Sequence, residues 1–245
     1  QLGKQSKSHK FYYLGSSYRR ERPQKGRFRQ FRQFGLEAFG SSLPEQDAEI
    51  IYMSYSLYSS LGIKDLELKI NSIGNRDSRK KYKKALQNYF MKFKGDLTET
   101  SQKRLNNNPL RILDTKVDFE IDLIKNAPKI IDYLNKEDKE HFNRVLKFLD
   151  NMELPYTVDY YLVRGLDYYS RTVFEIQTNS LGAQNALCGG GRYDYLVEDL
   201  GGESTPAIGF AAGIERLIMA LDIDIKKLEK SPDISIISLG FPALK

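Results

Sequence analysis

The sequence is poor in the residues that build metal and disulfide sites. Its 245 residues include one cysteine, Cys188, and two histidines, His9 and His141. A single cysteine excludes a disulfide within the chain and a cysteine-based zinc cluster, and two histidines disfavour a His-rich metal site. We therefore assign no metal-ligating side chains from the sequence.

Long apolar runs are also missing. No stretch of about 18 apolar residues occurs, and the first ten residues, "QLGKQSKSHK", contain no apolar signal segment. These absences predict a cytoplasmic protein with no membrane partner. With 40% apolar residues the composition is that of an ordinary globular protein, and the length allows one large domain or two smaller ones.

The sequence motifs of the common nucleotide-binding loops and of the nucleophile elbow are absent as well. The sequence has no Gly-x-x-x-x-Gly-Lys-Ser/Thr loop and no Gly-x-Ser-x-Gly, and "GGGRYDYLVEDLGG" lacks the Gly-x-Gly-x-x-Gly spacing of a dinucleotide turn. Arginine remains as a phosphate-binding group. A guanidinium group binds phosphate in a fork and keeps its charge at any working pH, so arginines on a rigid sheet can bind a polyphosphate without a glycine loop.

Positive charge is concentrated near the start of the chain. The net charge is +6, but residues 1–40 hold ten Lys and Arg against two acids, Glu21 and Glu37, which gives +8 there and −2 for the remainder. Such a cluster is either a solvated face or a binding site for anions. Charge alone does not separate these two interpretations.

The apolar pattern predicts a hairpin, a helix and further strands. "KFYYLGSSYRR" and "FRQFGLEAFG" predict two antiparallel strands joined by the turn "PQKG", with arginines on both arms. Residues 44–62 show apolar residues near helical spacing, and "LELKINSI" alternates as a strand. Strand texture returns after residue 154, and "TPAIGFAAGIERLIMAL" predicts a strand of small residues that runs directly into an amphipathic helix. The predicted class is α+β, an antiparallel sheet flanked by helices.

A mostly helical insertion is predicted to interrupt this sheet. Residues 74–154 are rich in Lys, Asn, Glu and Asp and carry 18 Lys and Arg against 13 acids, an excess of +5 that is densest in "SRKKYKK". We predict a core formed by residues 1–73 and 155–230 around this insertion. Residues 231–245 would be a linker and the first strand of a further domain.

Four stretches resemble a known family. "YRRERPQKGRFRQFRQFGLEAFG", "LVRGLDYYSRTVFE", "CGGGRYDYLVEDLGG" and "TPAIGFAAGIERL" resemble, in order, motif 2 of class II aminoacyl-tRNA synthetases, the two histidine-binding motifs of histidyl-tRNA synthetases, and motif 3. The resemblance implies the class II sheet and activation of L-histidine by ATP with Mg²⁺, followed by transfer to the 3′ end of tRNA(His). It also implies a homodimer as the parent protein, of which this chain would be a catalytic-core fragment that lacks motif 1 and the anticodon-binding domain.

The resemblance further implies roles for individual residues toward ATP. Arg164, the hallmark of the family, would lie beside the α-phosphate and be the main catalytic residue. The other implied ATP-binding residues are Arg19 on the α-phosphate and the substrate carboxylate, also catalytic, Glu21 on the adenine side, Arg27 at the terminal phosphates, Phe31 stacked on adenine, and Arg216 at the γ-phosphate.

A second set of residues is implied for histidine and for tRNA. The implied histidine-binding residues are Glu37 at an imidazole N–H, Gln33 near the α-amino group, Tyr168 and Tyr169 as pocket walls, and Arg164. The implied tRNA-binding residues are Lys80, Lys81, Lys83 and Lys84 of the insertion, where the acceptor arm would arrive. Two positions depart from the family pattern: Arg32 stands where histidine is common, and Tyr195 where glycine is common.

Purely structural roles remain an alternative for some of these residues. Tyr168 and Tyr169 could be core residues, Glu37 could form an ordinary salt bridge, and the lysines could be a solvated helix face. For the whole chain, one alternative is a non-catalytic synthetase paralogue that regulates ATP phosphoribosyltransferase in histidine biosynthesis, although such paralogues usually lose the arginine set. The other is a basic RNA-binding module, which predicts no ordered ATP pocket.

Overall fold

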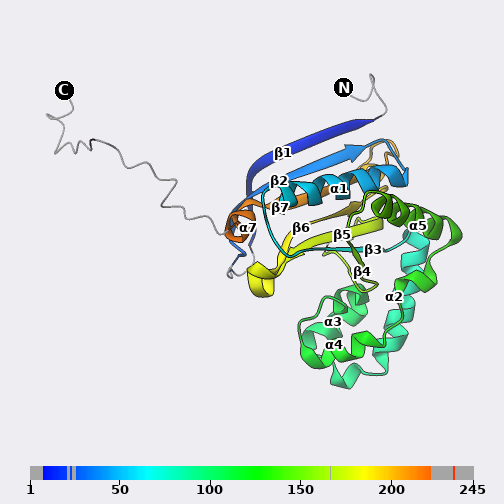
Figure 1. Ribbon diagram of the computed structural model, residues 1–245. Coiled ribbons are helices and arrows are strands. Elements are labelled where there is room, and N and C mark those ends of the chain that lie inside the picture. The colour runs from blue at the N-terminus through cyan, green and yellow to red at the C-terminus, as the bar shows by residue number, and fades with distance from the viewer. Residues whose placement is uncertain (1–7, 21–22, 24–25, 166, 222–233, 235–245) are drawn as a thin grey trace.

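A seven-stranded sheet forms the centre of the fold (Figure 1). The computed structural model describes residues 8–20, 23, 26–165, 167–221 and 234. The strand order is β1-β2-β7-β6-β5-β3-β4, and every pairing is antiparallel except that of β3 with β4. The α+β class with an antiparallel sheet and flanking helices is thereby confirmed. The strands are β1 His9–Tyr18, β2 Gln30–Phe39, β3 Leu66–Ser72, β4 Thr157–Val158, β5 Ser170–Thr178, β6 Ala186–Arg192 and β7 Ala207–Gly213.

The predicted hairpin is present at one edge of the sheet. Strands β1 and β2 pair without interruption from His9 opposite Phe39 to Tyr18 opposite Gln30. Beyond the last pair, the Arg19 backbone N–H donates to the Arg29 carbonyl at 2.8 Å, so the two arms stay together at the base of the turn. Of the predicted turn "PQKG", Gln24 and Lys25 lie outside the described residues.

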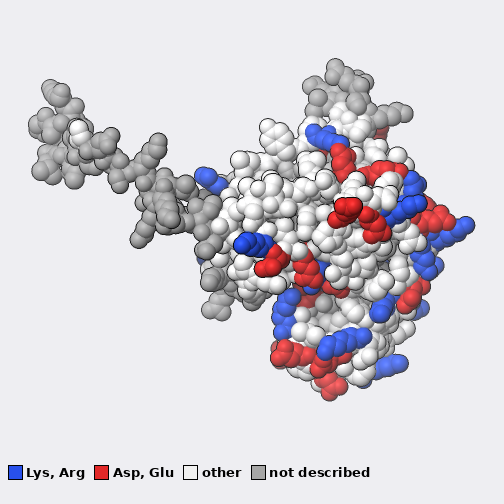
Figure 2. Space-filling model, viewed as in Figure 1, with Lys and Arg blue, Asp and Glu red and all other residues white. Residues whose placement is uncertain are grey.

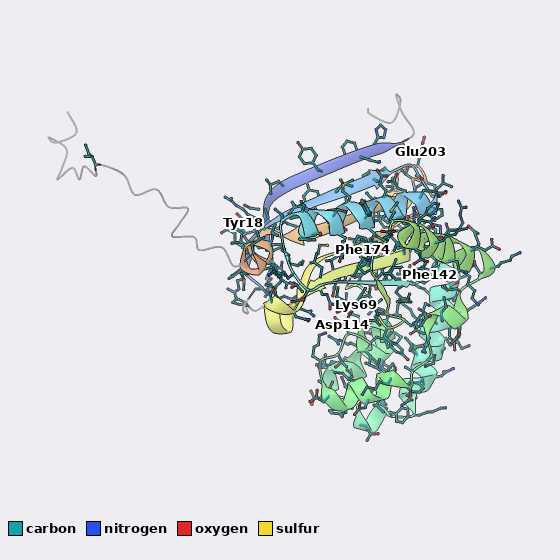
Figure 3. The ribbon with its side chains drawn as sticks, viewed as in Figure 1. Tyr18, Lys69, Asp114, Phe142, Phe174 and Glu203 are labelled. Atoms are coloured by element: carbon teal, nitrogen blue, oxygen red, sulfur yellow. The ribbon has the colours of Figure 1, made fainter. Side chains whose placement is uncertain are left out.

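Two long helices cover one face of the sheet. Helix α1 (Pro44–Ser60) begins with proline in its first turn and ends before Gly62, whose φ of +77° suits glycine. Helix α5 (Lys136–Asn151) packs beside α1. Phe142 from α5 and Phe174 from β5 are both buried in the core between these helices and the sheet (Figure 3). The helix predicted between Pro44 and Gly62 is confirmed.

The middle of the chain divides between two hydrophobic cores. Helices α2 (Arg76–Met91), α3 (Glu99–Asn107) and α4 (Asp118–Lys125), with short 3₁₀ turns, enclose a core of their own that extends from the main body (Figure 1). Helix α5 instead contributes Phe142, Val145 and Leu149 to the core beneath the sheet. We therefore propose that the insertion ends near residue 134 and that α5 belongs to the main body.

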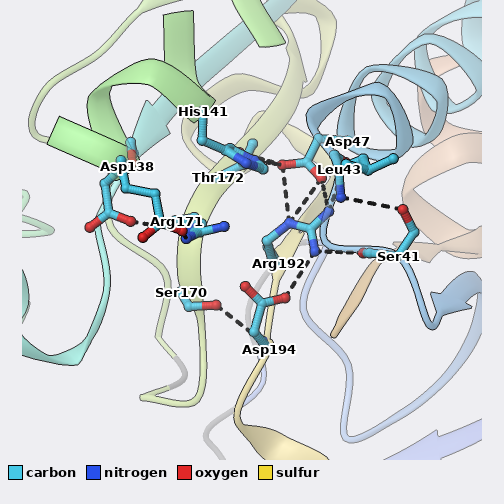
Figure 4. A network of polar contacts seen from close by, with 12 residues as sticks. Ser41, Leu43, Asp47, Asp138, His141, Ser170, Arg171, Thr172, Arg192 and Asp194 are labelled. Carbon is cyan, nitrogen blue, oxygen red and sulfur yellow. Dashed lines mark hydrogen bonds and ion pairs between the residues drawn. The ribbon is translucent and has the colours of Figure 1, made fainter. Parts of the chain in front are cut away.

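A buried polar network holds α1, α5 and the sheet together (Figure 4). Arg192 of β6 and Asp47 of α1 form an ion pair in which neither side chain has any exposed surface. The Asp47 carboxylate also contacts His141 Nε2 of α5 at 2.8 Å and accepts from the Thr172 hydroxyl at 2.6 Å. Asp194 accepts a second bond from Arg192 at 2.9 Å. The arginine of "GGGRYDY" thus has an internal, structural role.

The C-terminal part of the described chain follows the predicted pattern. Five of the seven residues of strand β7 are Ala or Gly, and the strand passes directly into helix α7 (Ile214–Ala220). No helix among the described residues has the length and apolar character needed to cross a membrane. The strand predicted within residues 231–245 lies outside the described residues, apart from Ile234.

Candidate active site

A pocket of about 570 Å³ lies on the sheet face opposite α1 and α5. Alternate residues of a strand point to opposite faces of the sheet. Along the strands, the residues that line this pocket therefore alternate with residues that fill the core. Eight residues that the sequence predicts for ATP or histidine line it together: Arg19, Phe31, Gln33, Glu37, Arg164, Tyr168, Tyr169 and Arg216. These eight come from three of the four motifs, and the remaining motif, "CGGGRYDYLVEDLGG", adds Cys188, Gly189 and Tyr193 to the lining, so all four motifs converge on one site.

Glycines keep the floor of the pocket open. Glu37 of β2 lies opposite Gly209 of β7, and a Cβ atom at Gly209 would overlap the Glu37 carboxylate. A Cβ atom at Gly189 of β6 would likewise overlap the guanidinium group of Arg164. These two glycines are needed because charged side chains lie flat against the sheet at their positions.

Arginines line one end of the pocket: Arg19 and Arg216, with Arg164 nearby. Burial, together with repulsion from Arg19, Arg27 and Arg164, lowers the pKa of Arg216 below its ordinary value. Arg27 itself does not line the pocket, whereas the adjacent Gly26 does.

The arginines are held by defined contacts. Arg216 Nε donates to the Gly26 carbonyl at 2.9 Å and Nη1 to the Ala186 carbonyl at 2.8 Å, which ties motif 3 to the hairpin turn and to β6. Arg164 forms an ion pair with Glu175 of β5 and retains a quarter of its side-chain surface exposed. A carboxylate partner fixes the direction of a guanidinium group while its other N–H groups remain available to bind an anion.

Arg19 covers the ring that the sequence predicts for adenine. Its guanidinium carbon lies 3.7 Å from the centroid of the Phe31 ring, in cation–π geometry. Adenine could stack on Phe31 only if Arg19 moved off this ring face toward a phosphate. Glu21, the predicted adenine-side carboxylate, lies outside the described residues.

The other end of the pocket is a carboxylate enclosed by aromatic rings. Burial raises the pKa of Glu37, although the Tyr193 hydroxyl, which donates a hydrogen bond to its carboxylate, acts in the opposite direction. The ring centroids of Tyr168 and Tyr169 lie 4.8 Å apart, and the ring centroid of Tyr193 lies 5.8 Å from that of Tyr168. A partly buried carboxylate between aromatic rings suits a planar ligand that donates an N–H.

Two aromatic residues of this end had no predicted role. Tyr193 lies in "GGGRYDY", and Tyr13 of β1 accepts a hydrogen bond from Gln33 Nε2 at 2.8 Å. Tyr13 pairs with Gly35, and a Cβ atom there would lie 2.5 Å from the Tyr13 hydroxyl. A glycine directly opposite a tyrosine across a hairpin was the available signal for an inward-facing ring.

The remaining predicted residues lie outside the pocket. Lys80, Lys81 and Lys84 are exposed on α2 and Lys83 is half-buried. Arg32 is exposed, and its backbone N–H donates to Glu215 at 2.7 Å. The Tyr195 ring lies under the Arg76 guanidinium group, with 4.4 Å between the guanidinium carbon and the ring centroid. Tyr195 does not line the pocket. Among the described residues, no group of three or more His, Cys, Asp or Glu side chains could hold a metal ion.

Comparison with known proteins agrees with this convergence of motifs. A family model described as histidyl-tRNA synthetase matches residues 1–217. The chain belongs to the histidyl-tRNA synthetase family. It is 49% identical over 232 residues to the histidine–tRNA ligase of Ruthia magnifica subsp. Calyptogena magnifica, covering 94% of this chain and 55% of that relative. It is 53% identical over 215 residues to that of Acholeplasma laidlawii, covering 87% and 51%. The chain thus spans about half the length of these relatives.

Solved structures of histidyl-tRNA synthetases share this fold. The apo histidyl-tRNA synthetase of S. aureus superposes with a TM-score of 0.68 at 41% identity, over 89% of this chain and 53% of that one. A Bacillus halodurans protein described as an ATP phosphoribosyltransferase regulatory subunit/histidyl-tRNA synthetase superposes with a TM-score of 0.62 at 23% identity, over 90% and 60%. The second likeness, at that identity, shows the fold alone.

Proposed function

We propose that this chain forms the catalytic core of a histidine–tRNA ligase. The observation that supports the proposal best is the pocket itself, in which Glu37 lies opposite Gly209 near the start of β7 and Arg216 follows the end of that strand, so that a carboxylate and an arginine stand at two ends of one cavity. The arginine end suits the phosphates of ATP, and the carboxylate end suits an imidazole N–H. ATP and histidine, bound next to each other, would together reach from the arginine end of the pocket to the carboxylate end.

The first reaction step needs fixed positive charge rather than a general base. The carboxylate of histidine, ionised at neutral pH, attacks the α-phosphorus of ATP and expels pyrophosphate, so two anions approach each other. Arg164 and Arg19, held at the pocket wall, would stabilise the charge that builds at phosphorus and position the reacting groups. The adenylate would then pass its histidyl group to the 3′ end of tRNA(His).

Mg²⁺ fits this pocket as an ion carried by ATP. Magnesium usually keeps several waters and binds through substrate phosphates with only one or two carboxylates, so it requires no all-protein cage. Glu215, which lines the pocket next to Arg216, is the carboxylate best placed to assist. When bound, the ion would offset part of the polyphosphate charge.

The direct test is ATP–pyrophosphate exchange with each amino acid in turn, performed on the intact protein. A histidine–tRNA ligase exchanges pyrophosphate only when histidine is present. A regulatory paralogue would bind histidine without exchange, and an RNA-binding module would do neither. The fold shared with the Bacillus halodurans protein keeps the regulatory paralogue as the second candidate. The presence of Arg19, Arg27, Arg164 and Arg216 favours the enzyme.

Glu37 offers a prediction on substrate selectivity. Replacing Glu37 with Gln removes the charge that faces the imidazole while keeping the shape, and should raise the KM for histidine by about tenfold or more with little effect on the KM for ATP. Tyr193→Phe is the matched control, because it removes the hydrogen bond to Glu37 and leaves the carboxylate. Equal rises in both KM values for Glu37→Gln would indicate a distorted hairpin instead.

The lysines of α2 offer a prediction on tRNA. Lys80, Lys81 and Lys84 are exposed, whereas Tyr82 is buried, so this side of α2 faces solvent. We expect neutral substitution of Lys80, Lys81, Lys83 and Lys84 together to weaken tRNA binding and flatten its salt dependence, because phosphate contacts fade as salt rises. Pyrophosphate exchange should stay nearly unchanged. A salt-titrated binding assay checks this, and an unaltered slope and affinity would leave the lysines as a solvated face.

We also propose a cytoplasmic homodimer. Helix α1 exposes Tyr52, Met53 and Leu57, and β1 exposes Tyr12 and Leu14 at the sheet edge. Charged side chains crowd the α5 and insertion side and the start of α1 in Figure 2, whereas the area over the C-terminal half of α1 is mostly uncharged. An apolar helix face beside an open strand edge is a surface that a second copy could cover. Sedimentation of the intact protein tests this directly.

A further inference from the structure

Side chains of the insertion hold the loop that carries the catalytic arginine. We call Arg164, Gly165 and residues 167–169 the active-site loop, which supplies Arg164, Tyr168 and Tyr169 to the pocket. Arg79 of α2 donates through Nη1 to the Asp167 carbonyl at 2.8 Å and also to the Tyr169 carbonyl. One guanidinium group thus bridges two backbone positions that flank a pocket tyrosine.

Two more contacts come from the segment after α3. Arg111, in the 3₁₀ turn η3 (Pro109–Ile112), donates through Nη2 to the Gly165 carbonyl at 2.7 Å. Asn108, just before that turn, donates through Nδ2 to the Asp167 carboxylate at 2.6 Å. Residues on both sides of α3 therefore reach the same loop, although some 54 to 90 positions separate the partners in sequence.

The ends of the loop are fixed differently from its middle. Asn71 of β3 donates through Nδ2 to the Leu162 carbonyl at 3.0 Å, and the Arg171 backbone N–H donates to the Gly74 carbonyl at 2.8 Å. These anchors belong to the sheet and to its direct continuation. Between them, the described side-chain bonds to the loop carbonyls come from Arg79 and Arg111 of the insertion. Apart from the ion pair of Arg164 with Glu175, the middle of the loop therefore takes its described side-chain contacts from the insertion.

Arg79 is suited to this task by its setting. It is half-buried between α2 and the loop, and burial lowers its pKa, which an opposing attraction to Asp167 partly offsets. Its acceptors are the backbone carbonyls of Asp167 and Tyr169, so these hydrogen bonds require no particular side chain in the loop. Arg79 does not line the pocket, so its contact with the loop is its link to the residues that do.

We propose that Arg79, Asn108 and Arg111 are positioning residues by which the insertion sets the active-site loop, and with it Arg164 and the two pocket tyrosines, in the geometry that binds and activates histidine. The proposal rests on the proposed ligase function for its kinetic consequence. Its structural consequence, a loop whose order depends on three insertion side chains, stands independently.

The experiment compares Arg79→Ala and Arg111→Ala with Arg76→Ala in the intact protein. Arg76 is a matched control because it lies one turn earlier on α2 and pairs with the exposed Asp199 instead of the loop. Hydrogen exchange of the backbone amides at residues 164, 165 and 167–169 should quicken by about tenfold in both loop variants and remain parental in the control. In pyrophosphate exchange, kcat/KM for histidine should fall by about tenfold or more, since small misplacements of positioning groups are costly, while the KM for ATP stays within about twofold.

Conservative replacement gives a second readout. Arg79→Lys keeps the charge but has a single ammonium group that cannot hold both carbonyls in the same fork, so it should recover only part of the loss. If Arg79→Ala proves too unstable to study, Arg111→Ala, at an exposed position, decides the matter. Loop exchange and histidine kinetics that match the Arg76→Ala control in both variants would overturn the proposal. Absence of histidine-dependent exchange in the parent would instead refute the ligase function, and amide exchange at the loop would still decide the positioning role.

Discussion

Replacing Arg164 with Gln should reduce histidine-dependent pyrophosphate exchange by about 10² or more, because it removes a fixed cation from beside the reacting phosphorus. The structure gives the reason for so large an effect. Arg164 lies on the pocket wall, is directed by the ion pair with Glu175, and rests over Gly189, where a Cβ atom would overlap its guanidinium group. A glutamine amide can fill much of this space but cannot supply the charge.

Controls for this variant separate catalysis from folding. The Arg164→Gln change leaves the Glu175 carboxylate, only 15% exposed, without its cation, so some loss of stability is expected. Direct ATP binding and the thermal midpoint should therefore be measured beside the rate. Arg144→Gln, the same change at a surface ion pair with Glu45, is the matched control and should leave exchange at the parental rate. An Arg164→Gln protein that is folded and exchanges pyrophosphate at the parental rate would contradict the assignment.

The sequence was most informative where local pattern and chemistry coincide. The hairpin followed from two alternating stretches and a turn, and the passage of β7 into α7 followed from a strand of small residues before an amphipathic run. The pocket residues followed from the order of four motifs, each of which carries its residues at a fixed spacing. Alternation along β2 then brings Gln33 and Glu37 to one face of the sheet.

Such local patterns could not predict contacts between segments that are distant in the sequence. The apolar residues of α5 have the same helical spacing whether the helix packs within the insertion or beneath the sheet. Only the fold shows that Phe142 belongs to the main core. The pairing of Arg164 with Glu175 could not be predicted, although both lie in "LVRGLDYYSRTVFE", because it depends on the chain folding back so that Arg164 lies over Gly189, the residue opposite Glu175 in the sheet. Arg79 was passed over for the same reason, since a lysine-rich helix gives no sign that one of its cations faces inward.

A second large effect is expected from Asp47, at the centre of the buried network in Figure 4. Asp47→Ala removes the buried carboxylate partner of Arg192, whose side chain has no exposed surface, and leaves this buried positive charge with only the partly exposed Asp194 as an ion-pair partner. Loss of one member of a buried ion pair typically costs about 3–5 kcal/mol of unfolding free energy. Denaturant unfolding of the intact protein measures this cost.

The surface pair between Glu45 and Arg144 supplies the matched control, because it joins the same two helices, α1 and α5, only two residues from Asp47. Its side chains are 44% and 55% exposed, so Glu45→Ala should cost no more than about 1 kcal/mol. Similar losses for Glu45→Ala and Asp47→Ala would contradict the importance of the buried pair and reduce the network to ordinary helix packing.

Acid titration tests the same pair by another route. Burial alone would raise the pKa of Asp47, but the charge of Arg192 and the hydrogen bond from His141 hold it below its usual range. A carboxyl group with a lowered folded pKa stabilises the protein above its unfolded pKa, and this contribution is lost as the pH falls through the folded value. The stability difference between parent and Asp47→Ala should therefore persist at neutral pH and narrow only below about pH 4, where an unfolded aspartate begins to take up its proton. A difference that narrows already at higher pH would place the titrating group elsewhere in the network.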